Sequence, residues 1–158
     1  MDSNKTIINE ILLFTLDELA YALQLPAVLR VIHAMEIRRL PKSPEIISGI
    51  INVQGQIIPV VDIRKRFGLS ERETDPDDRM IIADTGKREI AMFVDTVTGI
   101  KELTSLQFSD SKKTLPFAGY IKGVAKIDNE LILIYDLEQF LSLDEELVLK
   151  QVLRTKDK

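Results

Sequence analysis

Residues 46–69 read Ile-Ile-Ser-Gly-Ile-Ile-Asn-Val-Gln-Gly-Gln-Ile-Ile-Pro-Val-Val-Asp-Ile-Arg-Lys-Arg-Phe-Gly-Leu, and a related stretch follows 74 positions later, at 121 minus 47. β-branched residues dominate both copies, a two-residue turn candidate interrupts each, and an aspartate closes the second apolar run. We therefore predict that each copy forms two strands, a tight turn and a short helical turn capped by the aspartate. The identical pairs are Ile47 and Ile121, Gly49 and Gly123, Ile58 and Ile132, Asp62 and Asp136, and Leu69 and Leu143.

The residues upstream repeat as well. Residues 21–28 match residues 90–97 at an offset of 69, at 91 minus 22, and Val31 then falls on Ile100. The second half is therefore five residues longer than the first between these two blocks, and the extra residues are most simply placed in the loop around Leu106 to Thr114. The sequence thus indicates two half-length units of one ancestry. Many short β segments with few helices favour a mainly β fold of two five-stranded barrels packed together.

Composition sets further bounds. The chain has 158 residues, is 45% hydrophobic with a mean hydropathy of +0.03, and contains no cysteine, so it predicts a real core without disulfides. No signal peptide or apolar stretch of membrane-spanning length is evident, which favours the cytoplasm. A net charge of -4, a pI near 5.1 and 6% aromatic residues argue against nucleic-acid binding.

The expected organisation is a tail over residues 1–10, a single domain over residues 11–145, and a C-terminal helix and tail over residues 144–158. Within the domain the two units cover about 11–69 and 80–143, with exchange of strands between them left open. The polar segment 70–79 contains Pro76 and is predicted to be a solvated linker between the halves.

A C-terminal helix is predicted from its start signal. Ser142 and Glu145 have the spacing of a capping box. The apolar residues expected on one face of this helix are Leu143, Leu147, Val148 and Leu153.

Several motifs occur in a fixed order along the chain. They are Leu13-Phe14-x-Leu16, Tyr21-Ala22-Leu23, Val28-Leu29-Arg30-Val31-Ile32, the block from Ile47 to Arg64, and Val94-Asp95-x-Val97-x-x-Ile100. This set resembles the CheW family of bacterial chemotaxis coupling proteins over about residues 11–145, and the central block is specific. The resemblance implies two SH3-like barrels around a shared core.

The resemblance also implies a function. A protein of this kind is a non-enzymatic adaptor that joins the cytoplasmic tip of methyl-accepting chemotaxis receptors to the regulatory domain of a CheA-type histidine kinase. The alternative is a related scaffold in a non-flagellar chemosensory pathway, with motility by pili or another output. Neither reading includes catalytic residues, a metal, a cofactor, nucleic acid or membrane insertion.

Seven residues are the candidate binding site. The repeat places Val28, Val31 and Ile100 at equivalent edges of the two halves, where they are either core residues or the lining of a cleft for a partner helix. The resemblance favours the cleft and adds Arg30, Asn52, Gln54 and Gly55 to the receptor- or kinase-binding set.

Two of these residues depart from the family pattern. The family usually has Asn-Leu-Arg-Gly where this chain has Asn52-Val53-Gln54-Gly55, and an acid where it has Arg30. A basic position has become neutral and an acidic one basic. If both side chains face the partner, the charges that complement them should differ too.

One motif is similar to that of an enzyme. Asp84-Thr85-Gly86 follows an apolar run, as the catalytic aspartate does in retroviral-type aspartic proteases. Such a site needs two carboxylates that share a proton, here from a homodimer. Lys87 stands where those enzymes carry a small residue, and an ordinary hairpin turn accounts for the triplet. We therefore expect a turn and no enzyme.

The remaining polar motifs do not predict a metal, phosphate or nucleotide site. His33 is the only histidine and has no second ligand type nearby in sequence, so a metal site is not predicted. Arg38-Arg39 and Arg64-Lys65-Arg66 are candidates for a phosphate-binding patch, but a solvated face is the commoner explanation. A Gly-rich phosphate loop is lacking, so no nucleotide is expected.

Overall fold

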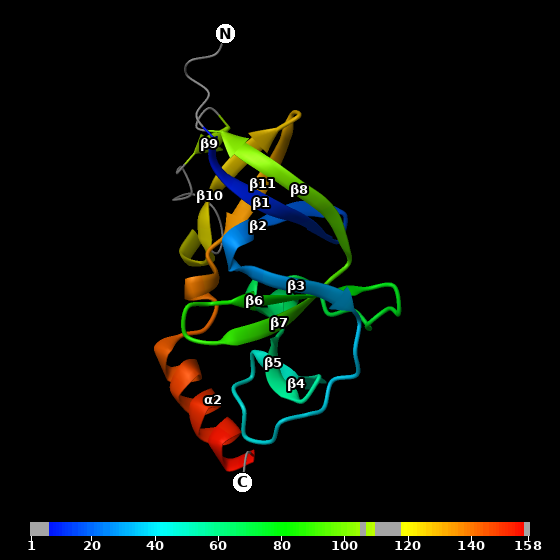
Figure 1. Ribbon diagram of the computed structural model, residues 1–158, viewed down its shortest axis with the longest axis vertical. Coiled ribbons are helices and arrows are strands. Elements are labelled where there is room, and N and C mark those ends of the chain that lie inside the picture. The colour runs from blue at the N-terminus through cyan, green and yellow to red at the C-terminus, as the bar shows by residue number, and fades with distance from the viewer. Residues whose placement is uncertain (1–6, 105–106, 110–117, 157–158) are drawn as a thin grey trace.

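The computed structural model describes residues 7–104, 107–109 and 118–156, which form two β-sheets and a few helices (Figure 1). The six-stranded sheet contains β1 (Ile7–Leu16), β2 (Leu19–Gln24), β8 (Thr96–Thr104), β9 (Phe108–Ser109), β10 (Ile121–Ile127) and β11 (Glu130–Tyr135). The five-stranded sheet contains β3 (Val28–His33), β4 (Ile47–Val53), β5 (Gln56–Val61), β6 (Arg79–Asp84) and β7 (Glu89–Val94). The helical elements are η1 (Leu25–Ala27), α1 (Ile63–Arg66), η2 (Ala118–Tyr120), η3 (Leu137–Gln139) and α2 (Leu143–Lys156).

The two sheets share one strand order, which confirms the internal repeat and the mainly β fold. The orders are β8-β1-β2-β11-β10-β9 and β3-β6-β7-β5-β4, and the offsets of the sequence repeat match the first five strands of one to the other. Even the parallel pairing recurs. Ala22 of β2 lies opposite Ile134 of β11, and Ala91 of β7 lies opposite Val60 of β5, at the positions that the repeat equates.

The sheets do not divide the chain at the middle of the sequence. The first hairpin, β1–β2, belongs to the six-stranded sheet, so the chain crosses between sheets at η1 and again at Asp95 (Figure 1). β1 starts at Ile7 and so includes the last four residues of the predicted tail. The loop predicted to hold the five extra residues falls mostly outside the described residues.

The segment 70–79 is largely exposed, as its polarity predicts, but it does not link the two sheets. It connects α1 to β6 within the five-stranded sheet. Asp78 is only 4% exposed, because its carboxylate accepts hydrogen bonds from Arg72 Nη2 at 2.8 Å and from the Asp75 amide at 2.9 Å. Both donors belong to the segment, so the buried carboxylate holds its local shape, and Arg72 also joins the segment to Asp95.

The turns and caps predicted from the repeat are confirmed. Gln54 and Gly55 have φ of 52° and 90°, and Asp128 and Asn129 have φ of 52° and 64°, as a two-residue hairpin turn needs. Each aspartate that ends a copy also caps the turn after it. Asp62 accepts from the Lys65 amide at 3.0 Å, and Asp136 accepts from the Glu138 amide at 3.2 Å.

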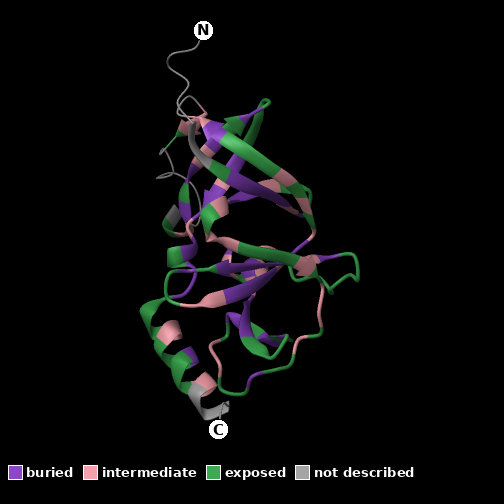
Figure 2. Ribbon diagram, viewed as in Figure 1, coloured by how far each residue is buried: buried purple, intermediate pink, exposed green. Residues whose placement is uncertain are grey.

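Three hydrophobic clusters fill the molecule, as the buried segments of Figure 2 indicate. Two of them each contain residues of a single sheet's half, and the largest lies between the sheets and contains residues of both. We call this largest cluster the shared core. Its fully buried side chains include Phe14, Leu16 and Leu23 from the six-stranded sheet, Ile81 and Ile90 from the five-stranded sheet, and Phe140 and Leu149 near the C-terminus.

The C-terminal helix starts as predicted but turns a different face to the protein. Ser142 and Glu145 form the capping box, with bonds of 2.8 and 3.1 Å between each side chain and the other residue's amide. Leu143, Leu147 and Val148 are 66%, 58% and 39% exposed, so three of the four predicted face residues lie outside (Figure 2).

Ion pairs explain this rotation of α2. Glu145 pairs with Arg66 and Glu146 with Arg88, both from the five-stranded half. Leu149 lies one helical turn beyond these glutamates, on the same side, and is fully buried. The packed face of α2 therefore contains the two paired glutamates and Leu149, with Val152 and Leu153 further along the helix.

Two glycines related by the repeat allow another segment of the same chain to pass close to the sheet. A Cβ on Gly49 would lie 2.2 Å from the Arg38 carbonyl oxygen, and one on Gly123 would lie 2.8 Å from the Ser109 carbonyl oxygen. Each glycine follows a register shift in its hairpin. A side chain at either position would push the crossing segment away.

We expect Gly49→Ala to lower the free energy of unfolding by about 2 kcal/mol or more, because the new methyl group meets backbone and φ is +154°. Urea unfolding followed by circular dichroism measures the loss. Gly119→Ala is the control, since a Cβ there meets nothing within 4 Å. Equal unfolding midpoints for the two variants would contradict this account.

Candidate functional site

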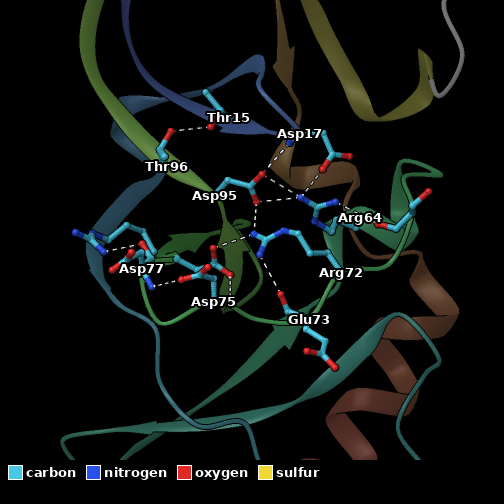
Figure 3. Close-up of polar contacts among 12 residues, drawn as sticks. Thr15, Asp17, Arg64, Arg72, Glu73, Asp75, Asp77, Asp95 and Thr96 are labelled. Carbon is cyan, nitrogen blue, oxygen red and sulfur yellow. Dashed lines mark hydrogen bonds and ion pairs between the residues drawn. The ribbon is translucent and has the colours of Figure 1, made fainter.

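Charged side chains converge where the chain crosses from one sheet to the other (Figure 3). We call this group, made of Asp17, Arg64, Arg72, Asp78 and Asp95, the crossover cluster. Asp95 lies between β7 and β8 and accepts from Arg64 Nη2 at 3.0 Å, from the Asp17 amide at 2.8 Å and from Arg72. Arg64 also pairs with the Asp17 carboxylate at 2.9 Å. The cluster thus ties the β1–β2 turn of one sheet to α1 and the 70–79 segment of the other.

Burial and charge act in opposite directions on Asp95. Burial raises the pKa of its carboxyl, but hydrogen bonds from Arg72, the Asp17 amide and Arg64 outweigh this, so the pKa lies below its usual range. The side chains of Arg64 and Asp95 are 12% and 22% exposed. Their pairing is therefore screened less by solvent than a surface salt bridge is.

The predicted alternatives for Arg64-Lys65-Arg66, a phosphate patch or a solvated face, do not describe the two arginines. Arg64 belongs to the crossover cluster. Arg66 donates to Glu145 at 2.7 Å and to the Tyr120 hydroxyl at 2.9 Å. Sequence charge gave no sign of these partners, because they lie 31 to 79 positions away along the chain.

Four of the seven predicted site residues lie on the edge strands β3 and β8. Val28 is half-buried and packs against the shared core. Arg30 is exposed, and Val31 and Ile100 are 40% and 55% exposed. Because the repeat equates Val31 with Ile100, the same edge position is apolar and exposed on both sheets.

The other three lie in the β4–β5 hairpin, at the opposite edge of the five-stranded sheet from β3. Asn52 Oδ1 accepts from the Gly55 amide at 2.8 Å, so its side chain holds the turn in shape. Gln54 and Gly55 are exposed at the tip. Within the part of the chain that the structure describes, no hydrogen bond or ion pair joins Arg30 to Gln54.

Two exposed apolar residues extend these groups and were missed from the sequence. Leu29 on β3 is 46% exposed, and Ile57 on β5 is 39% exposed. The repeat carried a signal for the second, since Ile57 matches Leu131, which is 67% exposed. An apolar residue at the same exposed place in both copies is more than a chance surface residue.

The residues considered for a protease site or a metal site lie in a turn and at a strand end. Asp84-Thr85-Gly86 forms the β6–β7 turn, where Asp84 Oδ1 accepts from the Gly86 amide at 2.7 Å. His33 is exposed at the end of β3. Over the described ranges, three or more histidine or acidic side chains nowhere come together as a metal site would need. Among the described helices, none is long and apolar enough to cross a membrane.

Two sheets of one strand order around one core, with apolar residues exposed on their edge strands, define a β domain built from an internal repeat. Comparison with known proteins gives the family. Residues 10–145 match the model of the CheW-like domain, and the chain belongs to that family.

The relatives agree with this assignment. The chain is 33% identical to chemotaxis protein CheW of Thermotoga maritima, over 90% of this chain and 91% of that protein. It is 25% identical to chemotaxis protein CheW of Klebsiella aerogenes, over 97% and 93%. The crystal structure of a scaffolding protein, TtCheW from Thermoanaerobacter tengcongensis, superposes with a TM-score of 0.79 at 30% identity and covers 87% of this chain and 90% of its own. These matches support a chemotaxis scaffold or adaptor.

The lowered pKa of Asp95 predicts how stability depends on pH. The cluster's contribution is complete above about pH 4, where the carboxyl is ionised in both folded and unfolded chains, and is lost as the pH falls through the lower folded pKa. Asp95→Asn should lower the free energy of unfolding by about 1 kcal/mol at neutral pH and flatten its decline in acid.

Urea unfolding at a series of pH values measures both effects. Asp128→Asn is the control, because Asp128 is 82% exposed and pairs only with Lys101 among the described residues. An acid dependence of Asp95→Asn as steep as that of the wild type would show that another carboxylate is responsible.

Proposed function

We propose that this protein is a non-enzymatic cytoplasmic adaptor that couples methyl-accepting chemotaxis receptors to a CheA-type histidine kinase. The observation that carries the proposal is the exposed apolar residue at one equivalent position of both edge strands, Val31 on β3 and Ile100 on β8. Membership in the CheW-like domain family supports it.

The receptor surface in this proposal consists of Val28, Arg30, Val31 and Ile100. A receptor tip is helical, and a helix docks by placing apolar residues on an apolar strip or groove. Val31 and Ile100 supply exposed contacts, and half-buried Val28 connects them to the shared core. Arg30 adds a positive charge that a receptor carboxylate would complement.

The kinase surface in this proposal is the β4–β5 turn, with Asn52, Gln54 and Gly55. Its position at the edge opposite β3 leaves room for a second partner while the first is bound. The bond from the Gly55 amide to Asn52 orders the turn before binding, which lowers the entropic cost of association. Two separate surfaces on one rigid body are what an adaptor requires.

Reconstitution tests the proposal. Receptor tips in membranes or nanodiscs, the kinase and this protein are combined, and kinase autophosphorylation is followed with each component left out in turn. The proposal predicts receptor control of the kinase only when all three are present. Equal kinase activity with and without this protein, despite folded components, would refute it.

We expect Val31→Asp to weaken receptor binding by on the order of 2 kcal/mol, or roughly thirtyfold, because docking would bury an unpaired carboxylate. Kinase binding should not change. Titration calorimetry with each partner separates the two effects. Leu147→Asp is a matched control, since Leu147 is 58% exposed and belongs to α2, which is part of neither proposed surface. Receptor affinity of Val31→Asp equal to that of the control would place the receptor elsewhere.

A further inference from the structure

Positive charge is concentrated in one short part of an acidic chain. Residues 28–42 contain Arg30, Arg38, Arg39 and Lys42 against the single acid Glu36, a net charge of +3. The whole chain carries -4, so the remainder carries -7. Arg38, Arg39 and Lys42 follow one another in the connection from β3 to β4 and are all exposed. We call these three residues the basic strip.

Among the described residues, the basic strip differs from the arginines that join the elements of the fold, because its three cations have no ion-pair partner. Arg64, Arg66, Arg72 and Arg88 each pair with at least one carboxylate. Within the described residues, the side chains of Arg38, Arg39 and Lys42 make no ion pair or hydrogen bond. The molecule thus neutralises its structural arginines and leaves these three cations open to solvent.

The backbone beneath the strip is nonetheless held firmly. The Arg38 amide donates to the Ile50 carbonyl at 2.9 Å, and the Ile50 amide donates to the Arg38 carbonyl at 2.7 Å. Gly49 permits this close approach, as the equivalent Gly123 of the repeat does in the other sheet. The side chains therefore project from a fixed base, and replacing them should not disturb the fold.

A groove of about 560 Å³, lined by four apolar and four polar residues, lies beside the strip. Ile57 is 39% exposed there, while Ile50 and Ile51 form buried parts of the wall. Arg38 and Arg39 also line the groove, together with Met35, Glu36 and Asn52. The isoleucines of the wall suit an apolar anchor residue, and the unpaired Arg38 and Arg39, which outnumber the single acid Glu36 of the lining, suit carboxylates around that anchor.

We propose that this groove and the basic strip dock an acidic protein segment with an apolar anchor residue, and that the strip selects partners by charge. This inference rests on the proposed adaptor function, because the acidic segment would belong to one of the adaptor's two partners. An anionic bilayer is the weaker match. Three cations are fewer than the four to eight of typical membrane-binding clusters, the net charge of -7 on the rest of the chain repels a bilayer, and a recessed anchor site serves a side chain.

The test uses the charge-reversal variant Arg38→Glu/Arg39→Glu. Its control is Lys87→Glu/Lys150→Glu, which changes the net charge equally at two exposed lysines without an ion pair among the described residues. The host's receptor tip and kinase regulatory domain are titrated separately against each protein at low and high salt. Thermal unfolding verifies that all three proteins are folded.

We expect the strip variant to bind one of the two partners about tenfold more weakly than wild type at low salt, with a smaller salt dependence, while the control binds as wild type does. Wild-type affinity of the strip variant for both partners would overturn the inference and leave the adaptor function standing. The inference would also be overturned if the strip variant lost binding to phosphatidylserine vesicles but kept wild-type affinity for both protein partners, because the strip would then belong to a membrane-binding surface. Failure of the wild-type protein to bind either partner would overturn the adaptor function itself.

Discussion

The shared core is the constraint on which the rest of this structure depends. Tyr135 of the six-stranded sheet stacks on Phe67, which follows α1 of the five-stranded half, with ring centroids 3.8 Å apart. Tyr21 also stacks on Tyr135, with ring centroids 5.2 Å apart. Burying each large side chain contributes about 1.5–3 kcal/mol, and neither half could hide these rings alone. The two sheets are therefore one body, and their edge strands keep a fixed relation.

The crossing of the chain between sheets complements this core with polar contacts. Asp95 stands at the second crossing, and its carboxylate joins the β1–β2 turn to Arg64 and Arg72. Apolar burial is not directional, whereas a carboxylate held by three donors fixes orientation. A rigid body with two separated surfaces is what allows an adaptor to transmit a change in one partner to the other.

The repeat made much of this fold predictable from sequence. It identified the paired hairpins, the turns at Gln54 and Asp128, and the capping aspartates, because these depend on residues close together in the chain. The exchange of β1–β2, the partners of Arg64 and the buried face of α2 depend on residues far apart, for which local pattern carries no signal. Of the candidate site, the equivalent edge positions Val31 and Ile100 were predictable from the repeat, whereas the exposure of Leu29 depends on packing that the local pattern does not show.

Site-specific photocrosslinking measures most directly whether both edge strands contact the receptor. The chain has no cysteine, so a benzophenone label can be placed on a single introduced cysteine at residue 31, 100 or 147. Each labelled protein is assembled with receptor tip and kinase, illuminated and analysed by mass spectrometry. The account predicts crosslinks to the receptor from residues 31 and 100 and none from residue 147. Receptor crosslinks from residue 147 alone, or from neither edge strand, would contradict it.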